Sequence, residues 1–307
     1  MIQNVNPATE HFLNALSQLQ QRLQTVQRQL SSGLRIERPS DAPDRVYDVV
    51  YRQSQIHHSS QILKNMARVQ ANVEAADAAL LQAVSVIEEA IVTGAQALNI
   101  NTDTLNRDAL AEEARSFHEA LVRLSLTSTE GRFVFGGDEN GQAPYQVNAA
   151  NGNGVDRLST SPATKLVLDF DGGRFLAGRT AQEIFDHREP DDSLSQDNAF
   201  AAVHALRTAI EAGDNTAIEA SMAKLHAAHE YLNRQFAFYG SVGNRIRDSI
   251  DQVQKTEVRM QSELSQIRDT DVAAAAVQLT QIQTSIEAAL RAQGSTAGAP
   301  NLFDFLR

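Results

Sequence analysis

Residues 12–43 read FLNALSQLQQRLQTVQRQLSSGLRIERPSDAP, and this stretch decides the fold class. Its first part carries apolar side chains at alternating steps of four and three residues, which is the spacing of a coiled-coil seam. The other positions are mostly Gln, Arg and Ser, so the helix buries one narrow stripe and needs a partner helix. The seam positions are Phe12, Leu16, Leu19, Leu23, Val26 and Leu30.

The seam stops at Ser31-Ser32-Gly33, where glycine suits the end of a helix. Pro39 and Pro43 keep the following residues from forming a continuous helix, and proline is a favoured first residue of the next one. From there to about Asn99 no proline occurs, and apolar residues again recur at steps of three and four. One long second helix is therefore predicted.

A second seam lies towards the other end of the sequence. An apolar stripe that includes Leu264 and Ile267 resumes after an alanine-rich shift of phase, which we interpret as a stutter within one long coiled-coil helix. Two weak seams at opposite ends can pair with each other and with other copies of the chain. The positions of this seam are Leu264, Ile267, Val277, Ile282, Ile286 and Leu290.

The middle of the chain changes period. Further helices are expected near residues 110–124, 198–211 and 216–238, the last opening with a capping box, Thr216-Ala-Ile-Glu219. Short alternating stretches such as Lys165–Phe170, between glycine-rich turns, predict a small β domain.

The fold class predicted is mainly α, with long antiparallel helices, terminal coiled-coil segments and a small inserted β domain. We expect five segments: 1–42, an N-terminal coiled coil and spoke; 43–130 and 193–255, two parts of a helical core domain; 131–192, the β domain; and 256–307, a C-terminal coiled coil. An ordinary closed helical bundle is the alternative from pattern alone.

Composition narrows the function classes. The net charge of −11 and the lack of a basic stripe argue against nucleic acid, and the absence of cysteine excludes disulfides and thiolate sites. No apolar stretch was expected to reach the roughly 20 residues of a membrane span, so no membrane partner is predicted. The first residues show no basic or apolar region, so no cleavable signal peptide is expected.

Three local patterns suggest ligand sites, but each fits an ordinary structural role better. Gly131–Gly137 lacks the Lys and Ser/Thr of a phosphate loop, and Asp169–Gly173 lacks the closing Glu of a calcium loop, so both are expected to be turns. His226, His229 and Glu230 could approach a metal on one helix, but no second ligand cluster accompanies them. We expect no catalytic, cofactor or metal site.

The stretch Gln29–Pro43 resembles the N-terminal signature of the bacterial flagellin superfamily, specifically of its hook-filament junction branch. Gly131–Gly137 with Pro144–Val147 looks like the entry of that branch into its β domain, and Gly240–Ile246 looks like the turn into the C-terminal helix. Leu264–Val272 and Leu302–Leu306 are similar to the family's C-terminal region. The motif residues are Ser31, Ser32, Gly33, Arg35, Ile36, Arg38, Pro39, Ser40, Asp41 and Pro43.

The resemblance implies a structural subunit and not an enzyme. It would be exported unfolded by the flagellar type III apparatus, with an export chaperone masking its C-terminal region, and would lie outside the cell in the flagellum. There it would join hook to filament, with copies of itself, flagellin and the hook-side junction protein as partners. The alternatives are a filament flagellin or, in another class, a globular helical enzyme or adaptor.

Overall fold

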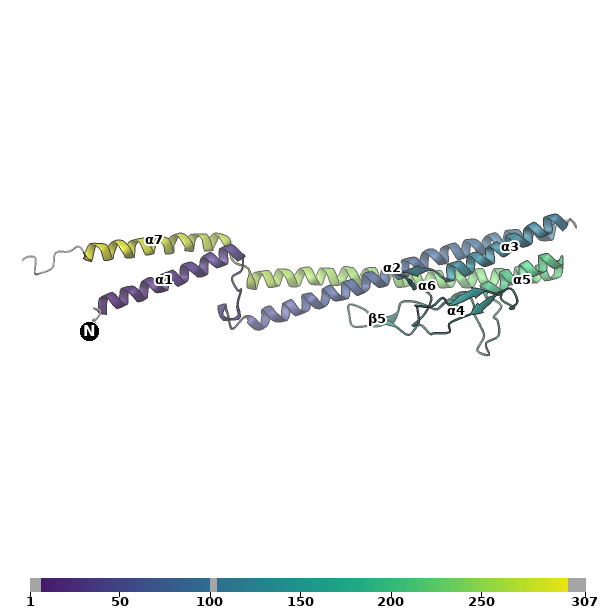
Figure 1. The fold of residues 1–307 in the computed structure, drawn as a ribbon, viewed down its shortest axis with the longest axis horizontal. Coiled ribbons are helices and arrows are strands. Elements are labelled where there is room, and N and C mark those ends of the chain that lie inside the picture. Colours follow the sequence, from purple (N-terminus) through teal and green to yellow (C-terminus); the bar gives the residue numbers. More distant parts are fainter. Residues whose placement is uncertain (1–6, 100–103, 298–307) are drawn as a thin grey trace, which may run out of the picture. The chain divides into compact units, whose positions relative to one another are not determined.

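The computed structural model describes residues 7–99 and 104–297, and it divides into two compact units. The terminal unit comprises residues 1–59 and 256–307, and the core unit comprises residues 60–255. Two helices, α2 and α6, contribute residues to both units (Figure 1). The helices are α1 (Pro7–Ser32), α2 (Val46–Asn99), α3 (Thr104–Ser125), α4 (Ala181–Ile184), α5 (Ala199–Ala212), α6 (Asn215–Arg268) and α7 (Val272–Ala297), with one 3-10 turn at Pro39–Asp41.

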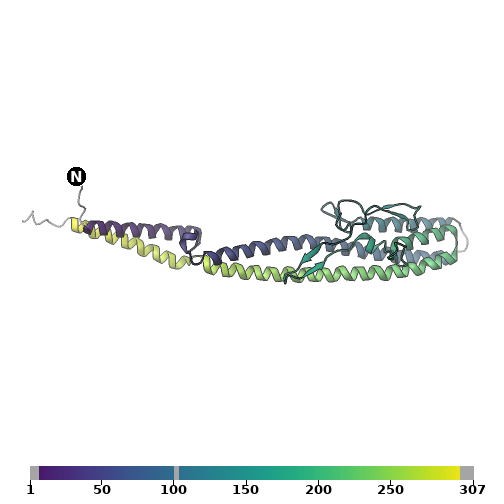
Figure 2. The same ribbon diagram turned by 90° about the horizontal axis from the view of Figure 1, so that it is seen from below.

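In the terminal unit, the helices from the two ends of the chain lie side by side, α1 next to α7 (Figures 1 and 2). The first residues of α2 pack against the last residues of α6 through a small apolar cluster. The mainly α fold predicted from the sequence is confirmed.

The prediction of one continuous C-terminal helix with a stutter is wrong. Helix α6 ends at Arg268, and α7 starts at Val272. Between them, the Asp271 side chain accepts the backbone amide of Ala274 at 3.0 Å, which caps the first turn of α7 and stabilises a new helix start. The phase shift in the apolar pattern therefore marks a break between two helices.

The expected turn at Gly240–Ile246 is also wrong, because α6 continues through it. A Cβ atom added at Gly243 would lie 3.6 Å from Cγ1 of Val73, so α2 approaches α6 closely there in the core unit. The cap of α6 differs from the predicted box too. The Asp214 side chain, rather than Thr216, accepts backbone amides at the helix start, from Thr216 at 2.9 Å and Ala217 at 3.2 Å.

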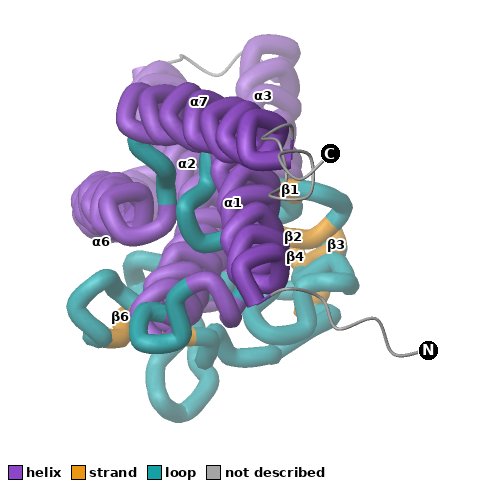
Figure 3. The backbone as a smooth tube through the Cα atoms, turned by 90° about the vertical axis from the view of Figure 1, so that its left-hand side faces the viewer, coloured by secondary structure: helices purple, strands orange, loops and turns teal. Residues whose placement is uncertain are grey.

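The core unit is built around one hydrophobic cluster to which α2, α3, α5 and α6 all contribute. Its side chains are fully buried because each helix turns an apolar stripe inwards. Figure 3 shows the predominance of helix over strand in the whole chain. Representative members are Leu80 and Ile87 of α2, Leu121 of α3, Leu206 of α5 and Leu232 of α6.

The β region is three separate two-stranded hairpins and not one sheet. Phe135, Tyr145 and Phe175 from this region belong to the same cluster as the helices, so the hairpins cover the helical core and share its interior. The antiparallel pairs are β1 (Ser128–Thr129) with β2 (Arg132–Phe133), β3 (Tyr145–Val147) with β4 (Val155–Arg157), and β5 (Leu166–Leu168) with β6 (Arg174–Leu176).

A buried carboxylate, Asp186, ties the β3–β4 hairpin to the helices. It is fully buried, and its oxygens accept hydrogen bonds from Tyr145 Oη at 3.0 Å and from the amides of Asn153 and Asn198 at 2.8 Å each. The guanidinium of Arg188 adds an ion pair at 2.9 Å. A buried charge is tolerated when donors surround it in this way, so the network specifies one position for the hairpin.

Helix α2 contains an 18-residue window with a mean hydropathy of 1.4, which is long and apolar enough to cross a membrane by composition alone. This finding differs from the expectation that no apolar stretch reaches that length. Met66, Leu80 and Ile87 of this helix are buried in the protein, and core helices of soluble proteins meet the same criterion. Burial in the core accounts for part of the hydropathy of α2, since 39% of this window is buried.

Two imidazoles fasten the turn of the β3–β4 hairpin. His118 of α3 is buried, and its Nε2 donates to the carbonyl of Asn153 at 2.9 Å. A Cβ on Gly154, whose φ is 75°, would lie 2.6 Å from His118 Nε2 and 2.8 Å from Nδ1 of His204, so only glycine fits between the rings. Burial lowers the pKa of both histidines, and the nearby guanidinium of Arg207 lowers it further.

This geometry predicts an acid-sensitive hairpin. The pKa of His118 in the folded protein lies below its ordinary value of 6.5. Neutral His118 therefore contributes fully to the stability of the hairpin above about pH 6.5, and this contribution is lost as the pH falls through the folded pKa. Hydrogen-exchange protection of the Asn148 and Gly154 amides should fall below pH 6.5. The paired His118→Gln, His204→Gln variant should remove this dependence. Equal loss at the Asp169 amide of the β5–β6 hairpin would point to general acid unfolding instead.

Candidate functional site

The predicted N-terminal seam forms one face of α1. Val26 is 6% exposed, and the other five seam residues are half-buried, while most of the remaining α1 side chains are exposed. Since α7 is the helix that α1 contacts, this stripe is the surface on which the two ends of the chain meet. The seam side chains are only half-buried because a single partner helix covers them from one side.

The facing stripe of α7 differs in part from the predicted seam. Ala275 is buried, and partly buried residues follow it at steps of four and three, whereas Val277 is 67% and Leu290 is 52% exposed on other sides of the helix. The sequence-based seam omits Ala275, Leu279 and Ala289. Their spacing of three and four residues with Ile282 and Ile286 indicates the stripe, but alanine adds little to an apolar pattern. The stripe consists of Ala275, Leu279, Ile282, Ile286 and Ala289.

A groove of about 980 Å³ lies between α1 and α7. Leu19, Val26 and Ile282 form its apolar part, five glutamines are the largest group of lining residues, and Arg22 is the charged one. The glutamines are Gln18, Gln21 and Gln29 from α1 with Gln278 and Gln281 from α7. The pair is therefore open along one side, where further helical surface could pack.

The predicted seam residues Leu264 and Ile267 lie elsewhere. Both belong to the end of α6, and they pack against Ile36 and Val49 in the small cluster of the terminal unit. Ile36 comes from the segment between α1 and α2, and Val49 from the first turn of α2. Leu264 and Ile267 therefore anchor the segment that connects α1 to α2, and they take no part in the α1–α7 pair.

The two helix breaks meet, and we call them together the elbow: residues 33–43 between α1 and α2, and residues 269–271 between α6 and α7. The backbone amides of Arg35 and Ile36 donate to the carbonyl of Arg268 at 2.7 and 3.1 Å. The amide of Thr270 donates to the carbonyl of Gly33 at 2.9 Å. Gly33 has a φ of 71°, which glycine adopts without strain.

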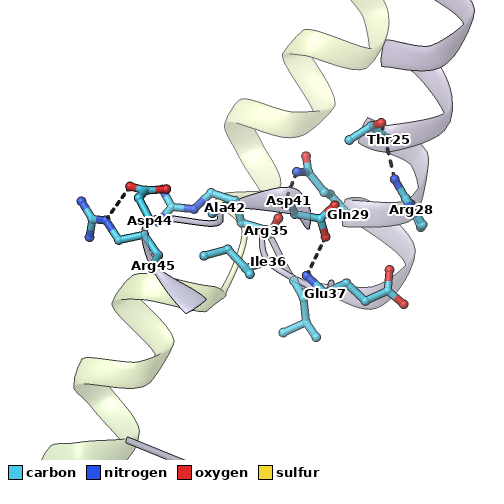
Figure 4. Close-up of a pocket in the computed structure, with 11 residues that line it drawn as sticks. Thr25, Arg28, Gln29, Arg35, Ile36, Glu37, Asp41, Ala42, Asp44 and Arg45 are labelled. Atoms are coloured by element: carbon cyan, nitrogen blue, oxygen red, sulfur yellow. Dashed lines mark hydrogen bonds and ion pairs between the residues drawn. The ribbon is translucent and has the colours of Figure 1, made fainter. Parts of the chain in front are cut away.

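The motif side chains stabilise the elbow. The Arg35 guanidinium donates to the carbonyl of Ile267 at 2.7 Å, and Asp41 Oδ2 accepts the amide of Arg38 at 2.7 Å. Asp41 Oδ2 also accepts the amide of Glu37 at 3.0 Å (Figure 4). These amides, from Arg38 first and then Glu37, hold the pKa of Asp41 below its usual range.

The remaining motif residues complete the turn geometry. Ser31 Oγ donates to the carbonyl of Arg28 at 2.9 Å, and Ser32 Oγ accepts the amide of Leu34 at 3.2 Å. The other exposed motif residues are Arg38, Pro39, Ser40 and Pro43.

A pocket of about 390 Å³ lies at the elbow (Figure 4). Its lining mixes the cations Arg28, Arg35 and Arg45 with the anions Glu37, Asp41 and Asp44, so the charges balance and no single ligand charge is favoured. In the parts of the chain that the structure describes, no three His, Cys, Asp or Glu side chains gather as a metal site would require. The pocket is a packing feature of the elbow.

The ligand patterns considered in the sequence have structural partners. Asp169 pairs with Arg245 of α6 at 2.7 Å, and its segment forms the turn of the β5–β6 hairpin. His229 contacts Glu88 of α2 at 3.0 Å, while His226 is exposed. Gly131 forms the turn between β1 and β2 with a φ of 75°.

Comparison with known proteins settles the family. The model of the bacterial flagellin N-terminal helical region matches residues 4–140, and the model of the C-terminal helical region matches residues 222–299. The chain belongs to the bacterial flagellin superfamily. The resemblance inferred from the motif at the elbow is thereby confirmed.

Individual relatives share the architecture. Flagellar hook-associated protein 3 of Salmonella typhimurium is 25% identical over 271 residues, which cover 85% of this chain and 80% of the relative. Flagellin of Bacillus subtilis is 25% identical over 281 residues, covering 88% of each. A solved chain assigned as a flagellar hook-associated protein, from Vibrio parahaemolyticus, superposes with a TM-score of 0.64 at 15% identity, covering 75% of this chain and all of that one.

Membership of this family fixes the general role. The chain is a structural, non-enzymatic component of the bacterial flagellum, in an assembly exposed to the outside of the cell. Family members assemble with copies of themselves and with other flagellar components. The exposed groove and seams of the terminal unit are the surfaces suited to that assembly.

The elbow gives a direct prediction. Gly33→Ala should weaken it by about 1 kcal/mol, since a left-handed backbone disfavours alanine by roughly that amount. Exchange protection of the Arg35, Ile36 and Thr270 amides should fall about fivefold. The matched control is Gly240→Ala, where a Cβ meets nothing within 4 Å in the middle of α6, so it should not weaken the elbow. Unchanged protection in Gly33→Ala would mean that the left-handed backbone at Gly33 does not determine the stability of the elbow hydrogen bonds.

Proposed function

We propose that this chain forms the junction between the flagellar hook and the filament. The observation that carries this role, beyond general assembly, is the elbow motif: Arg38, Pro39 and Asp41 resemble the junction branch, and Asp41 holds the turn by accepting two backbone amides. The relation to hook-associated protein 3 over most of both chains supports it.

Assembly is proposed to proceed through the terminal helices. Each α1 or α7 helix buries one half-exposed stripe, so the pair is weakly held by itself and gains most from further packing. The groove offers a second copy a surface of mainly amide and apolar groups, with Arg22 as its charged member. In the polymer, subunits would repeat one heterologous contact.

Export is part of the same proposal. A chain without cysteine and with weakly paired ends can be held unfolded and passed through the flagellar type III channel. Free seams would associate early, so an export chaperone that covers the C-terminal region is proposed to mask α7. The hook-side junction protein and flagellin are the proposed neighbours after export.

A filament flagellin remains the second candidate, because Bacillus subtilis flagellin matches at the same identity over slightly more of the chain. The two candidate roles involve the same terminal helices and differ in the position of the subunit, either at the hook-filament junction or along the filament.

A deletion strain decides between them. Electron microscopy should show hooks without filaments, and flagellin should accumulate in the culture medium because export continues while attachment fails. Hooks without filaments and without flagellin in the medium would make this chain the filament subunit. Intact filaments would refute both roles.

A matched pair of substitutions tests the seam. Leu23→Asp should abolish assembly, because it removes about 1–2 kcal/mol of apolar burial and places a charge at the α1–α7 contact. Gln20→Asp adds the same residue to an exposed position of the same helix and should assemble normally. Filament length and export of each variant are the measurements. Normal filaments with Leu23→Asp would exclude assembly through this seam.

A further inference from the structure

The start of α2 carries an exposed aromatic surface that the monomer does not use. Tyr47 is 76%, Val50 is 57% and Tyr51 is 53% exposed, and the two tyrosine rings stack with their centroids 6.1 Å apart and their planes 13° apart. We call these three residues the ledge. Among the five tyrosines of the chain, by contrast, Tyr145 and Tyr239 are 1% exposed.

The ledge points away from the helix that α2 packs on. Val49 of α2 is buried against Leu264 of α6, and Arg52 forms an ion pair with Glu263 on the same side. At 3.6 residues per turn, Tyr47 and Tyr51 lie about 160° around α2 from Val49. Among the described residues of the terminal unit, the rings therefore contact no other aromatic or apolar partner than each other, although aromatic side chains contribute most when they are covered.

A second exposed surface lies on the opposite side of the same helix pair. Val258 of α6 is 65% exposed, and Arg259 and Ser262 beside it are also exposed. Relative to Leu264, which faces α2, these residues lie about 120–160° around α6. We call Val258, Arg259 and Ser262 the shelf.

We propose that the ledge of one copy of this chain packs on the shelf of the next copy. This inference rests on the proposed function, because it assumes that copies assemble side by side. Two different surfaces on opposite sides of one subunit make a heterologous contact, which repeats from copy to copy and builds a ring or helix. Each copy then offers one free ledge and one free shelf to its neighbours.

The chemistry of the two surfaces is complementary. Val258 supplies an apolar patch, and the small side chain of Ser262 lets an aromatic ring approach the helix closely. The Arg259 guanidinium can lie over a tyrosine ring, which attracts cations to its face. Asp48 lies beside Tyr47, and neither it nor Arg259 has an ion pair within the described residues, so the two charges are available to each other.

A second copy is the occupant that these observations favour. The ledge sits in the terminal unit, which also holds the α1–α7 pair proposed to assemble. A membrane would be bound by a cluster of cations around the rings, but Asp44, Arg45 and Asp48 near the ledge carry mixed charge. The shelf supplies an apolar residue, Val258, and a cation, Arg259, which suit the aromatic rings and Asp48 of a second copy.

Cysteine cross-linking tests the contact directly, because the natural chain contains no cysteine. One preparation carries Tyr51→Cys, the other carries Val258→Cys, and the two are mixed, assembled and treated with a short flexible bismaleimide. The expected product is a dimer that joins the two different variants, formed in assemblies and absent from dilute monomers. Dimers of Tyr51→Cys with itself would show a symmetric contact and overturn the proposal, as would no dimer in assemblies.

Substitution gives an independent readout. The paired Tyr47→Ser, Tyr51→Ser variant should need at least a tenfold higher protein concentration to assemble, with an unchanged circular dichroism spectrum and normal export. The control is Leu81→Ser, which removes an equally exposed apolar side chain from another part of α2. Equal assembly by the paired tyrosine variant and the control would reject the ledge as an assembly surface.

The two proposals can fail separately. If the deletion strain assigns this chain to the filament while the cross-link forms, the ledge contact stands and only the junction role is lost. If the deletion strain shows the junction phenotype while no cross-link forms, the junction role stands and the ledge proposal is wrong.

Discussion

One carbonyl oxygen, that of Arg268, accepts the backbone amides of both Arg35 and Ile36, and the terminal unit is organised around this pairing. It joins two helix ends that are far apart in the sequence. Without it, the breaks after Ser32 and Arg268 would each release a single helix with a half-exposed stripe. Because the two breaks are bonded to each other, α1 and α7 leave the elbow together and can form a pair.

The core unit solves a different problem. Its hairpins are too short to form a core of their own, so they share the interior of the helices and depend on buried polar contacts for position. Asp186 gathers donors from both hairpin and helix segments, and His118 holds the hairpin turn. Such contacts specify position more than they stabilise, since every buried charge must recover the hydration it loses.

The sequence predicted the elements that depend on local pattern. The α1 seam, the helix end at Gly33 and the mainly α class followed from spacing and from glycine and proline. The break at Asp269–Asp271 did not, because the apolar stripe resumes after it and a cap acts through one hydrogen bond that periodicity does not show. Gly240 and Gly243 suggest a turn by residue type, yet both lie inside α6, where Gly243 packs close to Val73 of α2.

Prediction of the candidate site was limited for a related reason. Ala275 and Ala289 face α1 although alanine carries little apolar signal, while the more apolar Val277 and Leu290 are exposed. Leu264 matched the spacing of the seam but packs on Ile36, a contact between segments more than two hundred residues apart. A pattern along one helix identifies a face; which partner covers it depends on tertiary structure.

The amide lining of the α1–α7 groove has a consequence for how strictly a partner must be aligned. Glutamine both donates and accepts, so a helix that slides along such a groove exchanges one hydrogen bond for a similar one, or for water, at little difference in free energy. Interlocking leucines would instead penalise every displaced register. A groove of this kind tolerates neighbours whose repeat lengths differ, so subunits packed along it can adjust their spacing without straining their own helices.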